Sequence, residues 1–312
     1  MSSIEDHEEI ERLRTQSTVS YLAMLKVISL TASIAVILVG CLVLVGWMLD
    51  IETLKRVLPG LLAMNPIAAI AFILAGVSLR LLRTERGDQR RLRIAQGCAF
   101  AVAMVGLLRL IEVLFGWDVG IDQLLFREKL DVGYQLPNRM APNTALNFLL
   151  VGSALLLLDR QPYHGHWPAQ YLTLAAAFAS SLPLVGYAYG IEAFYYGTAS
   201  YIPMPLPTAL TFVVLVVGLL CVRPDRGLMA IFTSDSAGGV MARRLLPAAI
   251  LIPAILGWLR LEGEWAELYD TELGVTVMVL SSMVIFAALV GWNAHLLYRA
   301  DVERKRAACL AV

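Results

Sequence analysis

Arg109 and Glu112 are two charged residues inside the otherwise apolar stretch 94–116. They are three residues apart, so on a helix they share one face and can form an ion pair. Charges at such a depth are costly, and they usually face the interior of a helix bundle or a wet cavity. One reading is therefore a ligand or switch site. The other readings are a structural ion pair that steadies the bundle, or an arginine that extends outward to the interface.

A second polar group, Asn143 and Asn147, opens the apolar stretch 143–158, and Thr208 and Thr211 occupy similar places in a later stretch. Such residues commonly form hydrogen bonds between helices in membrane proteins. They could also line a site for a small ligand, because helix N-termini converging there would offer positive dipole ends to an anionic group. Both interpretations remain open at this stage.

The densest aromatic group lies around residues 187–201 and includes Tyr187, Tyr195 and Tyr196, with Glu192 between them. Aromatic side chains at this position are typical of the belt that anchors helices at the membrane interface. The sharper hypothesis is an aromatic pocket that opens outward with Glu192 at its rim. We include Tyr187, Glu192, Tyr195 and Tyr196 among the candidate ligand-binding residues on that basis.

The sequence contains no pattern for catalysis or for a cofactor. It has no phosphate-binding loop, dinucleotide fingerprint, zinc-protease motif or nucleophile elbow. His164 and His166 stand in a polar segment without a third ligand, which is typical of a solvated loop. We therefore expect no catalytic residue, no metal site and no cofactor. No cysteine falls in a predicted outer loop, so we expect no structural disulfide.

Composition indicates which elements must position these residues. Apolar residues make up 58% of the chain and charged residues only 16%. Eight apolar runs are long enough, or nearly so, to cross a bilayer, and without water each must bond its backbone internally as a helix. The runs are 21–49, 66–82, 94–116, 143–158, 169–189, 206–222, 245–261 and 273–297.

A phrase recurs at the start of three of these runs, in Met64–Phe72, Met140–Phe148 and Met204–Phe212. Each copy follows a glycine and an aromatic residue that end the preceding run, and a looser fourth version of this exit is Gly257-Trp258. The repeated unit is thus a helix out, a short outer segment and a helix back. The predicted fold is an all-α membrane protein of eight transmembrane helices, arranged as four outward hairpins in parallel internal repeats.

Basic residues predict the orientation. If the N-terminus is cytoplasmic, 18 of the 25 Lys and Arg residues fall inside and six outside, with Arg109 within a span. Both termini are therefore expected in the cytoplasm of a bacterium, with the protein in its inner membrane. The acidic residues 1–20 form a cytoplasmic segment rather than a signal peptide. The helical membrane domain covers 21–298, and 299–312 begins a cytoplasmic signalling helix.

Several segments resemble the multi-span N-terminal membrane regions of bacterial sensor histidine kinases. They are Met140-Ala141-Pro142-Asn143-Thr144-Ala145, Arg243–Arg260 and Leu268–Gly274. In that family the membrane region precedes a signalling helix, PAS domains and a kinase or a diguanylate cyclase. The resemblance implies a sensory and dimerising input module of a two-component system. The kinase's own phospho-acceptor and ATP-binding motifs do not occur in this sequence, so the output half is expected to lie outside it.

The expected function is sensory input: the bundle responds to a periplasmic or intramembrane stimulus and passes the change to a cytoplasmic output domain. The chain itself is not expected to be an enzyme. The expected partners are membrane lipids, a second copy of the chain and an unidentified small ligand, with no nucleic acid. Two other classes remain open, namely a small-solute transporter or channel and a membrane anchor that binds no ligand.

Overall fold

The computed structural model describes residues 2–57, 61–84, 88–117, 120, 124–126, 139–160, 167–190, 203–234 and 236–310. All regular secondary structure in these ranges is α-helix. The helices are α1 (Ser2–Leu49), α2 (Glu52–Lys55), α3 (Pro66–Leu82), α4 (Gln89–Phe115), α6 (Pro142–Leu157), α7 (Pro168–Tyr189), α9 (Leu206–Cys221), α10 (Gly227–Thr233), α11 (Ala237–Trp265) and α12 (Thr271–Leu310). The prediction of an all-α fold is confirmed over this part of the chain.

Five helical segments in the described ranges are long and apolar enough to cross a membrane. They are Tyr21–Leu49, Gln89–Phe115, Pro168–Tyr189, Gly238–Trp265 and Thr271–Arg299. Three further apolar helices, α3, α6 and α9, have only 16 or 17 residues. The chain thus has the character of a membrane protein.

The three short helices begin with the repeated phrase, and its residues explain their starts. Each helix has a proline in its first turn, where a missing N–H costs no hydrogen bond. The side chain of Asn65 caps α3 by accepting a hydrogen bond from the Ile67 amide at 2.9 Å. The preceding long helices α4 and α7 end at Gly116 and Gly190, which adopt the left-handed conformation that glycine allows most easily.

The chain forms two compact units. One comprises Leu22–Met229, and the other comprises Met1–Tyr21 together with Ala230–Val312. In the second unit α11 and α12 pack against each other as a helical hairpin. The hydroxyl of Tyr269 donates to the carbonyl of Arg260 at 3.0 Å and so fixes the turn between them.

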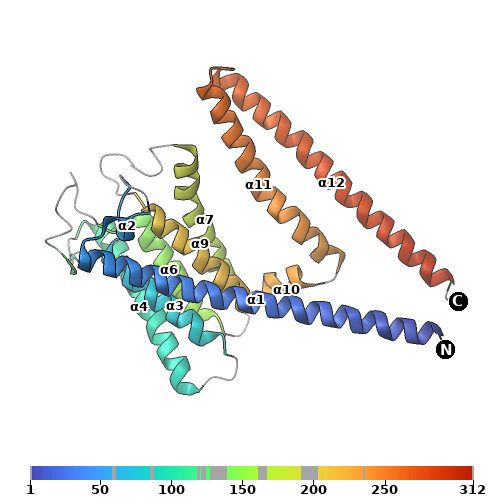
Figure 1. The fold of residues 1–312 in the computed structure, drawn as a ribbon, viewed down its shortest axis with the longest axis horizontal. Coiled ribbons are helices and arrows are strands. Elements are labelled where there is room, and N and C mark those ends of the chain that lie inside the picture. Colours follow the sequence, from blue (N-terminus) through green and yellow to red (C-terminus); the bar gives the residue numbers. More distant parts are fainter. Residues whose placement is uncertain are drawn as a thin grey trace. The chain divides into compact units, whose positions relative to one another are not determined.

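The larger unit is a bundle in which α3, α6 and α9 contact one another at the centre. Helix α4 packs between α3 and α6, and α7 packs between α6 and α9. Helix α1 completes the arrangement, because Gly76 of α3 lies against Ile37, and Gly218 of α9 lies against Ala32. Three inner helices are therefore surrounded by three outer ones (Figure 1).

The last residues of the three repeated phrases meet at the centre of this bundle. Phe72, Phe148 and Phe212 are fully buried, with ring centroids 4.6–4.9 Å apart and the rings steeply inclined to one another. This geometry places ring edges against ring faces, which is favourable for aromatic pairs. We call these three residues the phenylalanine cluster. Each of the three inner helices contributes one ring.

Glycines allow the outer helices to approach the inner ones closely. A Cβ atom on Gly40 would lie 2.7 Å from the carbonyl oxygen of Ala69, and one on Gly106 would lie 2.4 Å from that of Ala145. Ala69 and Ala145 occupy the same position in the first two repeated phrases. The α1–α3 and α4–α6 contacts thus use the same device, a small residue that brings backbones together.

Replacement of a ring in the phenylalanine cluster should destabilise the bundle strongly. Phe148→Ala is expected to cost about 3–5 kcal/mol, because it removes a fully buried ring and leaves a cavity. Phe178→Ala on α7 is the matched control, since that ring is 67% exposed. Thermal unfolding of the detergent-solubilised protein should show a large loss for the first variant only. Equal losses for both would contradict the assigned centre.

Candidate functional site

Arg109 and Glu112 form a buried ion pair on α4. The Nη1 atom of Arg109 lies 2.8 Å from Oε2 of Glu112, and the two residues are 6% and 4% exposed. Their sequence spacing predicted a shared face, and this contact is confirmed. A role in binding a ligand stays a prediction.

Arg109 also holds the start of the neighbouring inner helix. Its Nε donates to the carbonyl oxygen of Met140 at 3.0 Å, immediately before α6 begins. One guanidinium thus joins a carboxylate on α4 to the backbone of the next inner helix. Removing one partner of a buried charge pair leaves an uncompensated charge, so this connection depends on the carboxylate of Glu112.

The same backbone carbonyl accepts a side-chain hydrogen bond in all three repeats. The carbonyl oxygens of Met64, Met140 and Met204 each accept a hydrogen bond from a side chain of the preceding outer helix. The donors are Trp47 Nε1 at 2.9 Å, Arg109 Nε at 3.0 Å and Tyr187 Oη at 3.1 Å. Trp47 and Tyr187 are equivalent in the repeat, whereas their counterpart Trp117 is 64% exposed and Arg109 donates instead. The second repeat therefore uses a charged group for a task that aromatic residues perform elsewhere.

The polar residues at the start of α6 bond mainly within their own helix. The side-chain amide of Asn147 donates to the carbonyl of Asn143 at 3.0 Å, and Thr211 of α9 similarly donates to Pro207 at 2.6 Å. The bonds between helices predicted for Asn147 and Thr211 are therefore replaced by bonds within each helix. The reason is that both side chains reach the carbonyl of the preceding turn.

Three buried polar atoms near these residues have no hydrogen-bond partner in the described part of the chain. They are Oγ1 of Thr144, Oδ1 of Asn147 and Oγ1 of Thr208. Thr144 and Thr208 are equivalent in the repeat and lie one turn before Phe148 and Phe212. Buried polar atoms of this kind normally bind another group or an ordered water. In the described part of the chain, no protein group satisfies the hydrogen-bonding capacity of these three atoms.

The predicted aromatic pocket can be followed only in part. Tyr187 is half-buried, and its hydroxyl bonds to Met204 as described above. Glu192, Tyr195 and Tyr196 lie outside the described residues. Tyr187 thus has a structural contact, and the pocket stays a prediction.

Lys55 is a buried cation that the sequence analysis did not select. It is 3% exposed, lies 4.7 Å above the ring centroid of Trp47 and forms ion pairs with Asp50 and Glu52. Burial lowers the pKa of Lys55, but the hydrogen bonds to Asp50 and Glu52 outweigh this effect, and the net pKa is raised. The close spacing of Glu52 and Lys55 on a helix was the available signal.

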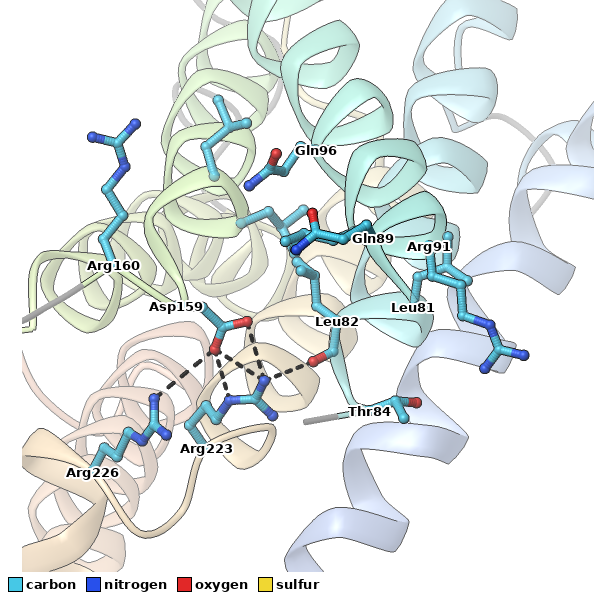
Figure 2. A pocket seen from close by; sticks show the side chains of 13 residues that line it. Leu81, Leu82, Thr84, Gln89, Arg91, Gln96, Asp159, Arg160, Arg223 and Arg226 are labelled. Carbon is cyan, nitrogen blue, oxygen red and sulfur yellow. Dashed lines mark hydrogen bonds and ion pairs between the residues drawn. The ribbon is translucent and has the colours of Figure 1, made fainter. Parts of the chain in front are cut away.

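A second charge cluster that the sequence analysis missed lies where the three inner helices end. Arg223 is 5% exposed, and its Nε donates to Oδ1 of Asp159 at 3.0 Å. Its Nη2 donates to the carbonyl of Leu82 at 2.9 Å (Figure 2). Leu82 ends α3, while Asp159 and Arg223 closely follow α6 and α9. One arginine therefore ties together the ends of all three inner helices, and we call this group the arginine clamp.

The arginine clamp follows the sequence repeat. Arg83, Asp159 and Arg223 stand at the same spacing after Met64, Met140 and Met204, respectively. That shared register was the signal that could have found the cluster. A cavity of about 490 Å³ adjoins it, lined by polar residues that include Gln89, Gln96 and Arg160.

The described residues include no group of three or more His, Cys, Asp or Glu side chains that could hold a metal ion. Cys41, Cys98 and Cys221 are free thiols. The charged groups that the structure does bring together tie helix ends to one another. This arrangement can hold the bundle in one packing.

No protein-family model, curated protein or solved structure matches this chain.

A double-mutant cycle tests the buried pair. Glu112→Gln should destabilise the bundle by about 3 kcal/mol, because Arg109 keeps its charge in a buried site without its carboxylate. Arg109→Gln should also destabilise it, since the Met140 carbonyl loses its donor. The double variant should lose clearly less than the sum of the two, by about 1–3 kcal/mol. Additive losses in chemical unfolding would show that the two charges are not coupled.

Proposed function

We propose that this chain is the membrane input module of a bacterial signalling protein of the sensor histidine kinase type. All eight apolar runs then cross the inner membrane as four outward hairpins, and both termini are cytoplasmic. The five long apolar helices and the apolar character of α3, α6 and α9 support this assignment. So does the excess of basic residues on the proposed inner side.

The observation that carries the proposal is the continuity of α12. It runs unbroken for 40 residues, from the apolar part Thr271–Arg299 into the charged segment Asp301–Arg306. Such a helix is about 60 Å long, roughly twice the hydrocarbon thickness of a bilayer. A shift or rotation of its membrane part would therefore be passed to its polar end as a rigid-body motion.

The interior of the bundle favours a sensor over a transporter or channel. A path along the axis of the three inner helices is closed by the phenylalanine cluster, and the arginine clamp joins the helix ends beyond it. Passage along this axis would need all of these contacts to separate. A sensor needs only a small change between two packings, which a ligand favours by binding one of them more tightly.

The buried Arg109–Glu112 pair also supports a sensor over a passive anchor. A helical anchor is most stable with an apolar interior, and a buried ion pair is weak support for stability alone. Such a pair is well suited to a switch, because its two charges stabilise only the packing in which they are in contact. The proposed partners are membrane lipids, a second copy of the chain and an unidentified small ligand.

A fusion that continues α12 past Val312 into a histidine kinase core tests the relay. Glu112→Gln is expected to change autophosphorylation severalfold in reconstituted membranes, because it alters the packing of α4 against the start of α6. Glu262→Gln is the matched control, since that carboxylate is exposed on α11 and should leave the output unchanged.

Two results would contradict the sensor proposal. Equal kinase output from folded wild-type and Glu112→Gln fusions would indicate a passive anchor. Solute flux through liposomes that contain the unfused chain, above that of empty liposomes, would indicate a transporter or channel. The folded state of each variant is checked by its thermal unfolding midpoint.

A further inference from the structure

The cavity beside the arginine clamp carries an excess of positive charge. Four arginines line it, Arg91, Arg160, Arg223 and Arg226, against the single carboxylate of Asp159. At neutral pH this lining has three more positive than negative charges. Thr84, Gln89 and Gln96 add further hydrogen-bonding groups. The chemistry of the cavity is that of a site for an anion.

The one carboxylate in the cavity is already engaged. Asp159 accepts from Arg223 at 3.0 Å, and Nη1 of Arg226 lies 4.0 Å from it (Figure 2). Arg91 and Arg160 form no ion pair within the described part of the chain, and no dashed line reaches either of them in Figure 2. Both are exposed. Figure 2 shows their guanidinium groups on opposite sides of the cavity, with Arg160 on the side of Gln96 and Arg91 pointing away from it. Arg160 is therefore the group available to an external anion beside Gln96.

A second hollow continues from this cavity between α4 and α6. Its volume is about 620 Å³, and it shares Gln96, Leu156 and Arg160 with the first. Its other lining includes Gly97, Phe100 and Leu157. Phe100 is 58% exposed, and nothing lies within 4 Å of a Cβ atom built on Gly97. A basic cavity thus passes directly into a mainly apolar hollow.

We propose that these two hollows bind one anionic phospholipid. Arg160 contacts its phosphate, with Gln96 as an additional donor, because both residues line the two hollows, and one acyl chain lies in the hollow against Phe100. The planar, multi-donor guanidinium group suits phosphate oxygens. Basic cavities between membrane helices are suited to anionic lipid headgroups for the same reason. The inference requires only that α4 and α6 lie in a bilayer, and it goes beyond the proposed signalling role.

Phosphate alone could satisfy the basic cavity, but it would leave the apolar hollow without an occupant. A phospholipid accounts for both hollows, because its charged and apolar parts are joined as the two hollows are. Free phosphate should therefore compete poorly with the intact lipid. A substitution that fills only the apolar hollow should weaken lipid binding and leave phosphate binding unchanged.

Native mass spectrometry of the full chain tests the site, with phosphatidylglycerol and phosphatidylcholine added separately to the detergent-purified protein. The wild type should bind phosphatidylglycerol in preference to phosphatidylcholine, and Arg160→Gln should weaken phosphatidylglycerol binding about tenfold or more. The matched control is Arg93→Gln, which removes the same charge from an exposed position of α4 outside the lining of both hollows. The control should bind phosphatidylglycerol as the wild type does.

A filling variant, Gly97→Phe, tests the apolar hollow, because Gly97 lines it and a Cβ atom at this position would meet no other atom within 4 Å. This variant should weaken phosphatidylglycerol binding severalfold, while its thermal unfolding midpoint stays that of the wild type. Equal weakening of phosphatidylglycerol binding by Arg160→Gln and Arg93→Gln would overturn the proposal in favour of a diffuse basic surface. No preference for phosphatidylglycerol over phosphatidylcholine would also overturn it. Displacement of the lipid by millimolar inorganic phosphate, with no effect of Gly97→Phe, would replace it with a free-anion site.

The outcome is independent of the signalling proposal. Loss of selective lipid binding in the cavity variant says nothing about kinase output through α12. Conversely, a fusion without a kinase response could still bind phosphatidylglycerol at this site. The two proposals therefore fail on different measurements.

Discussion

In a hydrocarbon environment every backbone polar group needs a partner within the protein, and the three short inner helices depend on this constraint. Two positions before each of them stands a methionine whose carbonyl accepts a hydrogen bond from an outer helix, through Trp47, Arg109 or Tyr187. Past their other ends, Arg223 satisfies the Leu82 carbonyl and the Asp159 carboxylate together. Because side chains bind both ends, helices of 16 or 17 residues can form the centre of the bundle.

The sequence predicted the helical class and the Arg109–Glu112 contact, because both follow from local periodicity. It did not predict the arginine clamp, since Asp159 and Arg223 are separated by 64 residues and only the folded bundle joins them. The repeated phrase indicated where helices begin but not that its final phenylalanines meet. That contact depends on the packing of three helices around one axis. Glu192, Tyr195 and Tyr196 lie outside the described residues, so the aromatic pocket stays a prediction.

The repeat also shows how one position can acquire a different chemistry. Two copies hold the helix start with an aromatic N–H or O–H, and the middle copy uses a buried guanidinium that needs a carboxylate. This exchange is one of the places where the three repeats differ. The proposed switch is located there, while the proposed lipid site lies among the residues that follow the inner helices. The unpaired atoms of Thr144, Asn147 and Thr208 fall between these two levels.

In the proposed relay, α12 carries a change in the packing of the bundle to the cytoplasmic face. Cys309 in the last turns of α12 offers a direct test, because the other three cysteines lie within apolar segments. A membrane-impermeant maleimide should label Cys309 in inverted membrane vesicles and leave it unlabelled in intact spheroplasts. Labelling in spheroplasts would place this end of α12 outside and contradict both the hairpin topology and the relay.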